Sequence, residues 1–315
     1  MLLLPFANVS ATITNQHVEL TMNDLLSSLE ASHVVAYQGE PGAYSHLACR
    51  HTFPNYVTHH CATFSEAMQM VEQGDALYAM IPVENSTAGR VEEIYRELRK
   101  TQLYVVQEHF EAVNHCLIVK QGVKLEDIKQ IGSHPQALAQ CDENIRALDA
   151  KSVAMYDTAG AAKYLSENDH QDMAVISSEL AAELYDLDVL NPHFNDREGN
   201  TTRFLVFAKQ HKLPPFIPEK TYITSFMFRV RNMPAALYKA MGGFATNGIN
   251  MLKLESYMVG GKFTATQFYA DVECHFQAPE MQSALEELGF FSDEIRMLGT
   301  YPADKYRFTK QQKKR

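Results

Sequence analysis

The sequence lacks the features that mark secreted, membrane-bound or nucleic-acid-binding proteins. No apolar run approaches the roughly 20 residues that a membrane helix needs. No Lys or Arg precedes Arg50, so the apolar start at Met1–Leu4 is without the basic flank of a signal peptide. With 28 basic and 38 acidic residues, the formal charge of −10 disfavours a nucleic-acid partner. We therefore expect a cytoplasmic protein with neither a membrane nor a nucleic-acid partner.

Signatures of metal and cofactor binding are missing as well. The five cysteines include no CxxC pair and are odd in number, which argues against a disulfide framework or a zinc site. The 13 histidines form no HxxxH or HExxH pattern, so we expect surface or capping histidines and no metal site. Gly39-x-x-Gly42 does not have the GxGxxG spacing of a dinucleotide site, and no Walker lysine follows it. No cofactor is expected.

The chain does contain two series of short apolar runs that alternate with helical patterns. This alternation is typical of βαβ units, and it predicts two α/β lobes of similar plan. The length of 315 residues suits more than one domain. Strands are expected at residues 34–37, 56–59, 78–82, 103–110, 115–119, 130–132, 152–154 and 173–176. Helices are expected from residue 43 and over 65–72, 90–100, 135–147, 158–165 and 178–185.

A proline-rich segment, residues 211–218, separates the lobes from a different pattern. Three prolines there cannot continue a strand or a helix, so we expect a domain boundary. The following order is strand, helix, strand, strand, helix, strand, which predicts a ferredoxin-like module. Its elements are expected at 222–230, from Pro234 to Gly248, at 249–258 and 263–272 around a turn at Gly260–Gly261, at 279–288 and at 295–299. Residues 1–32 are interpreted as an extension with a short helix near 23–29, and Lys310–Arg315 as a solvated basic end.

Four strand-to-helix junctions of the lobes place small or hydroxyl residues where a helix is expected to begin. Helix N-termini present unpaired N–H groups and bind anions readily. In open α/β sheets, such junctions gather beyond the carboxyl ends of the strands. They therefore indicate an anion-binding cleft between the lobes, with ordinary helix capping as the alternative. The junctions are residues 39–45, 84–89, 133–136 and 157–160.

Single residues in and after these junctions suggest chemistry. Glu84 ends an apolar strand, where burial would raise its pKa and suit acid catalysis; the alternative is a charge at a helix start. Gln136 and Gln140 share a helix face and could hold a carboxylate or hydroxyl, or be merely a polar surface. Thr202 and Arg203 place a hydroxyl and a cation at a strand entrance. Strand alternation points them to opposite faces, so both cannot touch the same atoms.

In order and spacing, these segments resemble prephenate dehydratase. The matching segments are Tyr37–Ser45, Ile81–Ser86, Ser133–Gln136 with Gln140–Cys141, and Asn200–Phe204. The later module resembles the ACT regulatory domain of the same enzymes at Ala235–Leu237, Gly248–Asn250 and Leu254–Ser256. The resemblance implies a bilobal catalytic domain similar to type II periplasmic binding proteins. It also implies decarboxylative dehydration of prephenate to phenylpyruvate, water and CO2 in phenylalanine biosynthesis.

The resemblance further implies a division into domains. They are a catalytic domain at 33–210 (lobe 1 about 33–110 and 200–210, lobe 2 about 111–199), a linker at 211–220, the ACT domain at 221–302 and a basic tail at 303–315.

The resemblance also implies roles for individual residues. Thr202 is the expected catalytic hydroxyl, and we expect it to relay a proton from a neighbour such as Glu84. The other catalytic or substrate-contacting candidates are Asn85, Ser133 and Gln140. The substrate-binding candidates are Gly42, Ala43, Tyr44, Ser45, Ser86, Gln136 and Arg203. The candidates for phenylalanine binding are Ala235, Ala236, Leu237, Asn247, Asn250, Glu255 and Ser256.

The regulatory module departs from the family pattern. Glu255-Ser256-Tyr257-Met258 stands where the family usually has Glu-Ser-Arg-Pro, and Ala235-Ala236-Leu237 stands for Gly-Ala-Leu. Inhibition by phenylalanine and a homodimer or homotetramer formed through the ACT domain are still expected. Three alternatives stay open. They are an arogenate dehydratase, a non-catalytic bilobal solute-binding protein, and an amino-acid sensor with inactive lobes.

Overall fold

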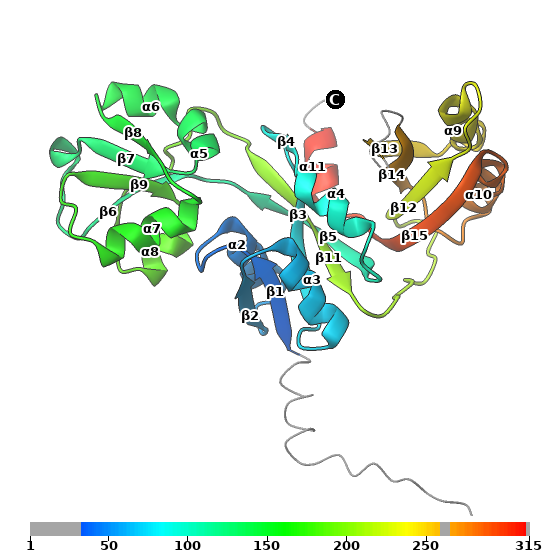
Figure 1. Ribbon diagram of the computed structural model, residues 1–315, viewed down its shortest axis with the longest axis horizontal. Coiled ribbons are helices and arrows are strands. Elements are labelled where there is room, and N and C mark those ends of the chain that lie inside the picture. Colours follow the sequence, from blue (N-terminus) through cyan, green and yellow to red (C-terminus); the bar gives the residue numbers. More distant parts are fainter. Residues whose placement is uncertain (1–32, 259–264, 313–315) are drawn as a thin grey trace, which may run out of the picture.

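The computed structural model describes residues 33–258 and 265–312, which form three sheets with flanking helices. In Figure 1, lobe 1 occupies the centre, lobe 2 lies on its left, and the C-terminal module lies on its right. The helix predicted near residues 23–29, the turn at Gly260–Gly261 and the end of the basic tail, residues 313–315, lie outside the described residues.

Lobe 1 is a mixed sheet with helices on both faces. Its order is β2-β1-β3-β11-β5; β1 is parallel to β2 and β3, whereas β11 runs antiparallel to β3 and β5. Helix α2 covers one face, and α3 and α4 cover the other. The strands are β1 (Val34–Gln38), β2 (Val57–Cys61), β3 (Tyr78–Asn85), β4 (Gly89–Arg90), β5 (Tyr104–Ala112) and β11 (Thr201–Ala208). The helices are α2 (Tyr44–Thr52), α3 (Phe64–Gln73) and α4 (Glu92–Leu98).

Lobe 2 repeats this plan, which confirms the prediction of two similar lobes. Its order is β10-β6-β9-β7-β8, in which β7 is parallel to β8 and β9. Strand β6 runs antiparallel to β9, just as β11 runs antiparallel to β3 in lobe 1. The helix predicted over 135–147 is divided at Cys141, whose ψ of 16° is not helical. The strands are β6 (Cys116–Val119), β7 (Gln130–Ser133), β8 (Lys151–Ala154), β9 (Met173–Ser177) and β10 (Asp188–Asn191). The helices are η1 (Leu125–Asp127), α5 (Pro135–Gln140), α6 (Asp142–Ala147), α7 (Thr158–Glu167) and α8 (Glu179–Leu184).

The C-terminal module has the predicted βαββαβ order, with an antiparallel sheet in the order β13-β14-β12-β15. Helix α9 begins at Ala236 and not at Pro234, because Ala235 takes a left-handed conformation with φ 57°. The elements are β12 (Tyr222–Val230), α9 (Ala236–Thr246), β13 (Asn250–Met258), β14 (Ala265–Glu273), α10 (Pro279–Phe291) and β15 (Ser292–Pro302).

The module shares a hydrophobic core with lobe 1, although a proline-rich segment joins them in sequence. Ile81 and Leu205 of lobe 1 belong to the same buried cluster as Met227 and Leu298 of the module. Gly299 of β15 lies so close to β5 that a Cβ there would be 2.0 Å from the backbone oxygen of Val105. The sheet of the module is therefore covered by its own helices on one face and by lobe 1 on the other.

The segment after β15 also returns to lobe 1. Helix α11 (Tyr306–Gln312) lies beside β5, where Tyr306 stacks on Phe110 with ring centroids 4.6 Å apart. Arg307 bonds to Glu108 through Nε at 2.7 Å and Nη2 at 2.8 Å. The expectation of a basic tail over 303–315 is thus corrected for its first part, because a stacked ring and a buried ion pair dock this part.

No helix among residues 33–258 and 265–312 is both long and apolar enough to cross a membrane.

Candidate active site

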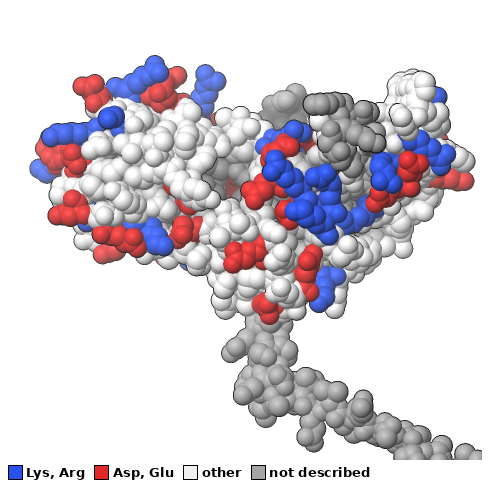
Figure 2. All heavy atoms as spheres, in the orientation of Figure 1, with Lys and Arg blue, Asp and Glu red and all other residues white. Residues whose placement is uncertain are grey.

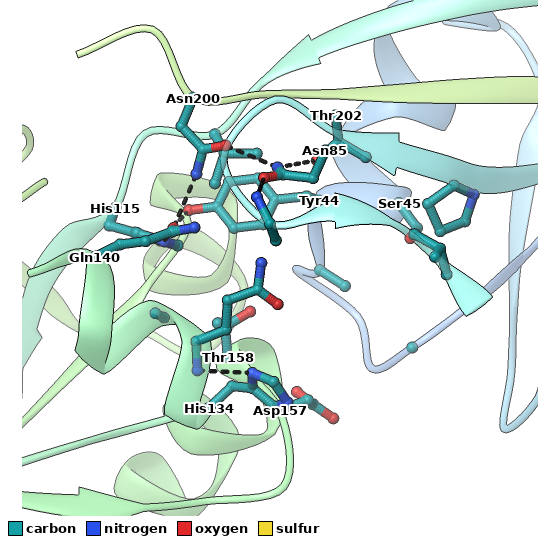
Figure 3. Close-up of a pocket in the computed structure, with 18 of the residues that line it drawn as sticks. Tyr44, Ser45, Asn85, His115, His134, Gln140, Asp157, Thr158, Asn200 and Thr202 are labelled. Atoms are coloured by element: carbon teal, nitrogen blue, oxygen red, sulfur yellow. Dashed lines mark hydrogen bonds between the residues drawn. The ribbon is translucent and has the colours of Figure 1, made fainter. Parts of the chain in front are cut away.

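A cavity of about 400 Å³ lies between the two lobes, and both contribute to its walls. Figure 3 shows Tyr44, Ser45, Asn85 and Thr202 of lobe 1 opposite residues of lobe 2. From lobe 1 and β11 it is lined by Gln38, Gly39, Ala43, Tyr44, Ser45, Pro82, Asn85, Ala88, Gly89, Arg90, Val91, Thr202 and Phe204. From lobe 2 and the segments that join the lobes it is lined by Val113, His115, His134, Gln136, Ala137, Gln140, Asp157, Thr158 and Asn200.

Three of the four predicted junctions line this cavity with the beginning of a helix. The first residues of α2, α5 and α7 lie in its wall, beyond the carboxyl ends of β1, β7 and β8. The backbone N–H groups and dipoles at helix starts favour negative charge. The cleft between the lobes is therefore suited to an anionic ligand.

The junction at residues 84–89 forms a turn between β3 and β4 instead of starting a helix. The side-chain oxygen of Asn85 accepts the backbone N–H groups of Thr87 and Ala88, both at 2.9 Å. These two bonds fix the orientation of the amide, so that Nδ2 points toward β11. There Nδ2 donates to Thr202 Oγ1 at 2.9 Å and to Asn200 Oδ1 at 2.7 Å.

This network crosses to lobe 2 through Gln140. Asn200 Nδ2 donates to Gln140 Oε1 at 2.8 Å, and His115 Nε2 lies 2.9 Å from the same oxygen (Figure 3). Because an amide oxygen can only accept, His115 must carry a proton on Nε2. The hydroxyl of Tyr44 lies 2.9 Å from His115 Nδ1 and 2.8 Å from the backbone oxygen of Asn114.

The ionisable members of this network are neutral. Burial lowers the pKa of His115, although the hydrogen bond with Gln140 acts in the opposite direction. Burial also raises the pKa of Tyr44 well above its ordinary value. At neutral pH this network therefore presents hydroxyl, amide and imidazole groups without a charge of their own, whereas Asp157 and Arg90 are the charged residues of the wall.

Arg90 is the one Lys or Arg side chain among the described residues that line the cavity. Its guanidinium bonds to Glu92 through Nε at 2.7 Å and to Glu255 of the module through Nη1 at 3.0 Å. The side chain is 42% exposed. Arg90 thus links the rim of the cavity to the C-terminal module.

The comparisons with known proteins agree with this geometry. The family model described as prephenate dehydratase matches residues 35–212. The chain belongs to the prephenate dehydratase family. It is 45% identical over 280 residues to a "Bifunctional N-acyl-homoserine lactone acylase/prephenate dehydratase" of Komagataeibacter europaeus, which covers 89% of this chain and 99% of the relative. It is 38% identical over 303 residues to "Arogenate dehydratase/prephenate dehydratase 1, chloroplastic" of Arabidopsis thaliana, over 90% of this chain and 76% of the relative.

A solved structure gives the same assignment. A prephenate dehydratase from Arthrobacter aurescens, in complex with L-Phe, superposes with a TM-score of 0.79 at 25% identity. The match covers 90% of this chain and 100% of that one. The bilobal fold predicted from the resemblance is thereby confirmed.

Within this prephenate dehydratase fold, Glu84 does not line the cavity. Its carboxylate bonds to Arg203 at 3.0 Å and to Lys253 of the module at 2.7 Å. Burial alone would raise the pKa of Glu84, but these two cations and their hydrogen bonds outweigh it, and the pKa is lowered. The structure therefore corrects the interpretation of Glu84 as an acid with a raised pKa that supplies Thr202 with a proton.

Arg203 also lies away from the cavity, on the opposite face of β11 from Thr202, as alternation predicts. Its side chain is 2% exposed and bonds to Glu108 at 2.8 Å and to Asp271 of the module at 2.6 Å. Its Nη2 donates to the hydroxyl of Tyr301 at 3.1 Å. All of this excludes contact with a ligand in the cleft, and the proposed anion-binding role of Arg203 is corrected.

Three more candidates support the cavity from behind and do not line it. The Ser133 hydroxyl is fully buried and donates to the backbone oxygen of Ile176 at 2.7 Å. Ser86 accepts from the backbone N–H of Thr201 at 3.0 Å, which holds the start of β11. Gly42 joins the lobes: with φ +94° it lies against α8, where a Cβ would be 2.7 Å from Ala181.

The residues predicted to bind phenylalanine lie at the start of α9, at its end and on β13. Three of the polar ones have partners within the chain: Asn247 with Glu287, Asn250 with Glu273, and Glu255 with Arg90. The unusual Tyr257 is buried against α4 of lobe 1, its ring 5.3 Å from that of Tyr95. This departure from the family pattern thus serves the contact between module and lobe. Phenylalanine binding by Ala235, Ala236, Leu237, Ser256 and their neighbours stays a prediction.

Several cavity residues were not among the sequence candidates. His134, Asp157 and Thr158 lie in junctions that the sequence did indicate, and Asn200 lies in the segment Asn200–Phe204. His115 carried no sequence signal beyond its place where the chain crosses into lobe 2. Gln38 lies in the matching segment Tyr37–Ser45 but was not singled out, and Arg90 was unmarked, because only the fold brings it to the cavity.

Proposed function

We propose that the chain catalyses the decarboxylative dehydration of prephenate to phenylpyruvate, water and CO2, in the biosynthesis of phenylalanine, with Thr202 as the donor to the departing hydroxyl. The observation that supports this most directly is the bond from Asn85 Nδ2 to Thr202 Oγ1. Because the hydroxyl oxygen already accepts a hydrogen bond, its own proton is left to donate into the cavity. A donor in this place is what a hydroxide leaving group requires.

The reaction places few other demands on the protein. As the ring carboxylate leaves as CO2, the electron pair of its C–C bond enters the ring, and the opposite C–O bond breaks. The hydroxide takes up a proton and becomes water, while the ring becomes aromatic. A positioned donor typically contributes roughly 10²–10⁴-fold to such a step. Thr202 is a weak acid, so we assign it a hydrogen bond to the leaving oxygen, and the proton that converts the departing hydroxide to water comes from solvent.

The cavity matches the substrate class in size and charge. About 400 Å³ lies in the range of small-molecule sites. Prephenate is a dianion, and the helix starts of α2 and α7 face the cavity from opposite lobes, with Arg90 at its rim. Ala43, Tyr44, Ser45, Gln136 and Gln140 are the predicted contacts that line the cavity.

The direct test mixes purified protein with prephenate and follows phenylpyruvate by its absorbance. Thr202→Val keeps the β-branched shape but removes the hydroxyl, and we expect kcat to fall by roughly 10²–10⁴-fold. Thr202→Ser restores the donor and should recover most of the rate. A Thr202→Val enzyme that folds and turns over like wild type would refute the assignment.

Arogenate dehydratase is the second candidate, since the Arabidopsis relative is named for both substrates. The chemistry at the ring is the same, and only the side-chain amino group differs. Side-by-side kcat/KM values for prephenate and arogenate decide between them. An N-acyl-homoserine lactone arm in the same assay tests the further activity in the name of the Komagataeibacter relative.

We further propose that the module is an ACT domain through which phenylalanine inhibits the enzyme, and that the chain forms a homodimer or homotetramer in the cytoplasm. Support comes from its βαββαβ order, from the bond between Glu255 and the cavity residue Arg90, and from the L-Phe complex of the Arthrobacter relative. Calorimetry with phenylalanine and light scattering are the tests. No heat of binding together with no inhibition would refute the regulatory role.

A further inference from the structure

A second polar cluster lies on the sheet of lobe 1, outside the catalytic network. His109 and Glu111 are two residues apart on β5, so their side chains share one face of the sheet. His51, in the last turn of α2, meets them there. Glu111 Oε2 lies 2.9 Å from His51 Nδ1 and 2.9 Å from His109 Nε2.

The donor set of this cluster is that of a metal site. Among residues 33–258 and 265–312 it is the one group of three His, Cys, Asp or Glu residues whose ligand atoms all lie within 4.8 Å of one another. Two imidazoles and a carboxylate suit zinc and other divalent transition metals, whereas magnesium and calcium prefer oxygen ligands alone. The dehydratase chemistry proposed above uses none of the three side chains.

We propose that His51, His109 and Glu111 bind a divalent transition-metal ion of the zinc class. Zinc bonds to nitrogen and oxygen at roughly 2.0–2.2 Å, which places neighbouring ligand atoms about 3.3–3.5 Å apart in a tetrahedron. The distances of 2.9 Å, and the limit of 4.8 Å for the whole group, bracket this value. Small side-chain rotations are therefore sufficient to admit the ion.

Burial and access fit an ion with three protein ligands. The Glu111 side chain is only 7% exposed and the His109 side chain 18%, whereas that of His51 is 55% exposed. His51 and Glu111 also line an open groove of about 1400 Å³ between α2 and lobe 2. An ion can enter from this groove and keep a water molecule as its fourth ligand. Glu179 and Glu183 line the same groove, as does one cation, Arg50.

Such an ion would tie helix α2, which helps to build the catalytic cavity, to β5, the strand beside β11. Helix α2 begins with Tyr44 and Ser45 in the cavity wall and ends at the cluster. Glu111 is the residue of β5 directly opposite Thr202 of β11. The metal site goes beyond the proposed dehydratase activity, and its test does not depend on that activity. Local spacing in the sequence could not indicate it, because its ligands come from two elements.

The test measures zinc binding by the full-length protein after dialysis against a chelator. We expect one Zn²⁺ per chain by elemental analysis, and Co²⁺ in its place should give the visible absorption of a four-coordinate site. Saturating Zn²⁺ should raise the melting temperature by about 5 °C or more at 100 times the Kd. A His51→Ala/His109→Ala double variant should bind Zn²⁺ at least roughly 100-fold more weakly.

Two further variants keep the result decisive. Glu111→Gln is nearly isosteric and should also lose the ion, even if the double variant folds poorly. His59→Ala/His60→Ala, which removes two exposed adjacent histidines of β2, should bind like wild type. Equal zinc binding by wild type and Glu111→Gln, or none by wild type, would overturn the proposal. Zinc binding without any dehydration of prephenate would leave the metal site standing and refute the proposed function instead.

Discussion

Thr202 and Arg203 are neighbours on β11, yet they lie in regions of opposite character. On the cleft side, Thr202 joins a network of neutral groups that reaches Asn85, Asn200 and Gln140. On the module side, Arg203 joins charged groups drawn from both parts of the chain. The cations there are Arg203, Lys253 and Arg307, and the carboxylates are Glu84, Glu108, Asp271 and Glu255.

This difference separates two tasks. A substrate that brings its own negative charges needs aligned donors in the cleft, and a fixed cation beside Thr202 is not required. A buried interface needs every charge to be compensated, and each of these three cations bonds to at least one of the carboxylates. Figure 2 shows that Lys and Arg side chains also gather on the outer surface where lobe 1 meets the module. The motif Thr202-Arg203 therefore joins the hydroxyl that we propose takes part in the reaction to an arginine that holds the module on lobe 1.

Removing the Arg203 guanidinium should have the largest effect of these substitutions, on the stability of the fold. Arg203→Met leaves Glu108 and Asp271, both fully buried, without their shared cation. We expect the free energy of unfolding to fall by about 3–5 kcal/mol, measured by urea denaturation. Arg229→Met is the matched control, because Arg229 is 44% exposed and only 3.6 Å from its partner Glu294. Equal losses for the two variants would contradict a special role of the buried network.

A substitution in the neutral network around Thr202 should change kcat more than it changes the free energy of unfolding. Asn85→Asp cannot donate to Thr202 Oγ1 or to Asn200 Oδ1, so the hydroxyl loses its fixed orientation. We expect kcat to fall by about 10²–10³-fold, the usual effect of losing one preorganised donor. Asn168→Asp, which changes an amide bonded only locally to Tyr164, is the control. If Asn168→Asp lowered kcat as much as Asn85→Asp does, the loss of activity could not be assigned to the bond with Thr202.

These two sides were not equally predictable from sequence. Alternation along β11 sufficed to place Thr202 and Arg203 on opposite faces, and the junctions indicated the cleft. The partners of Arg203 could not be predicted from the local sequence, because Glu108 and Asp271 are 95 and 68 residues away. Glu84 shows the consequence: its apolar strand suggested a raised pKa, but Arg203 and Lys253, the latter 169 residues further on, together lower it. Local sequence patterns therefore predict the helices and strands, whereas the contacts between the module and lobe 1 depend on the whole fold.

The stability that the charged groups around Arg203 contribute should also depend on pH, in a defined direction. Burial disfavours ionised Asp271, but Arg203 and hydrogen bonds from Ser225 and Tyr269 outweigh this, so its pKa is lowered. A carboxyl group of this kind stabilises the fold fully above its unfolded pKa of about 3.9, and the stabilisation is lost as pH falls through the folded pKa. Asp271→Asn should therefore reduce stability by about 1–3 kcal/mol at pH 7.

Denaturation at several pH values measures this effect. The difference between wild type and Asp271→Asn should narrow as the pH falls from about 5 to 2, where the wild-type carboxylate takes up its proton. Asp293→Asn is a suitable control, because Asp293 is 52% exposed and 3.6 Å from Arg231. A difference that stays constant over this range would show that Asp271 is not the titrating group.

The smallest effect should come from the point where the two regions meet, the bond between Arg90 and Glu255. Both partners are partly exposed, so Glu255→Gln should change the free energy of unfolding by less than about 1 kcal/mol. It should, however, leave Arg90 paired with Glu92 alone and remove a negative charge near the cavity, so that KM for prephenate falls roughly twofold to fivefold with kcat unchanged. Arg90→Met should shift KM in the opposite direction. If both variants leave KM unchanged, Arg90 only tethers the module, and the neutral and charged regions are independent of each other.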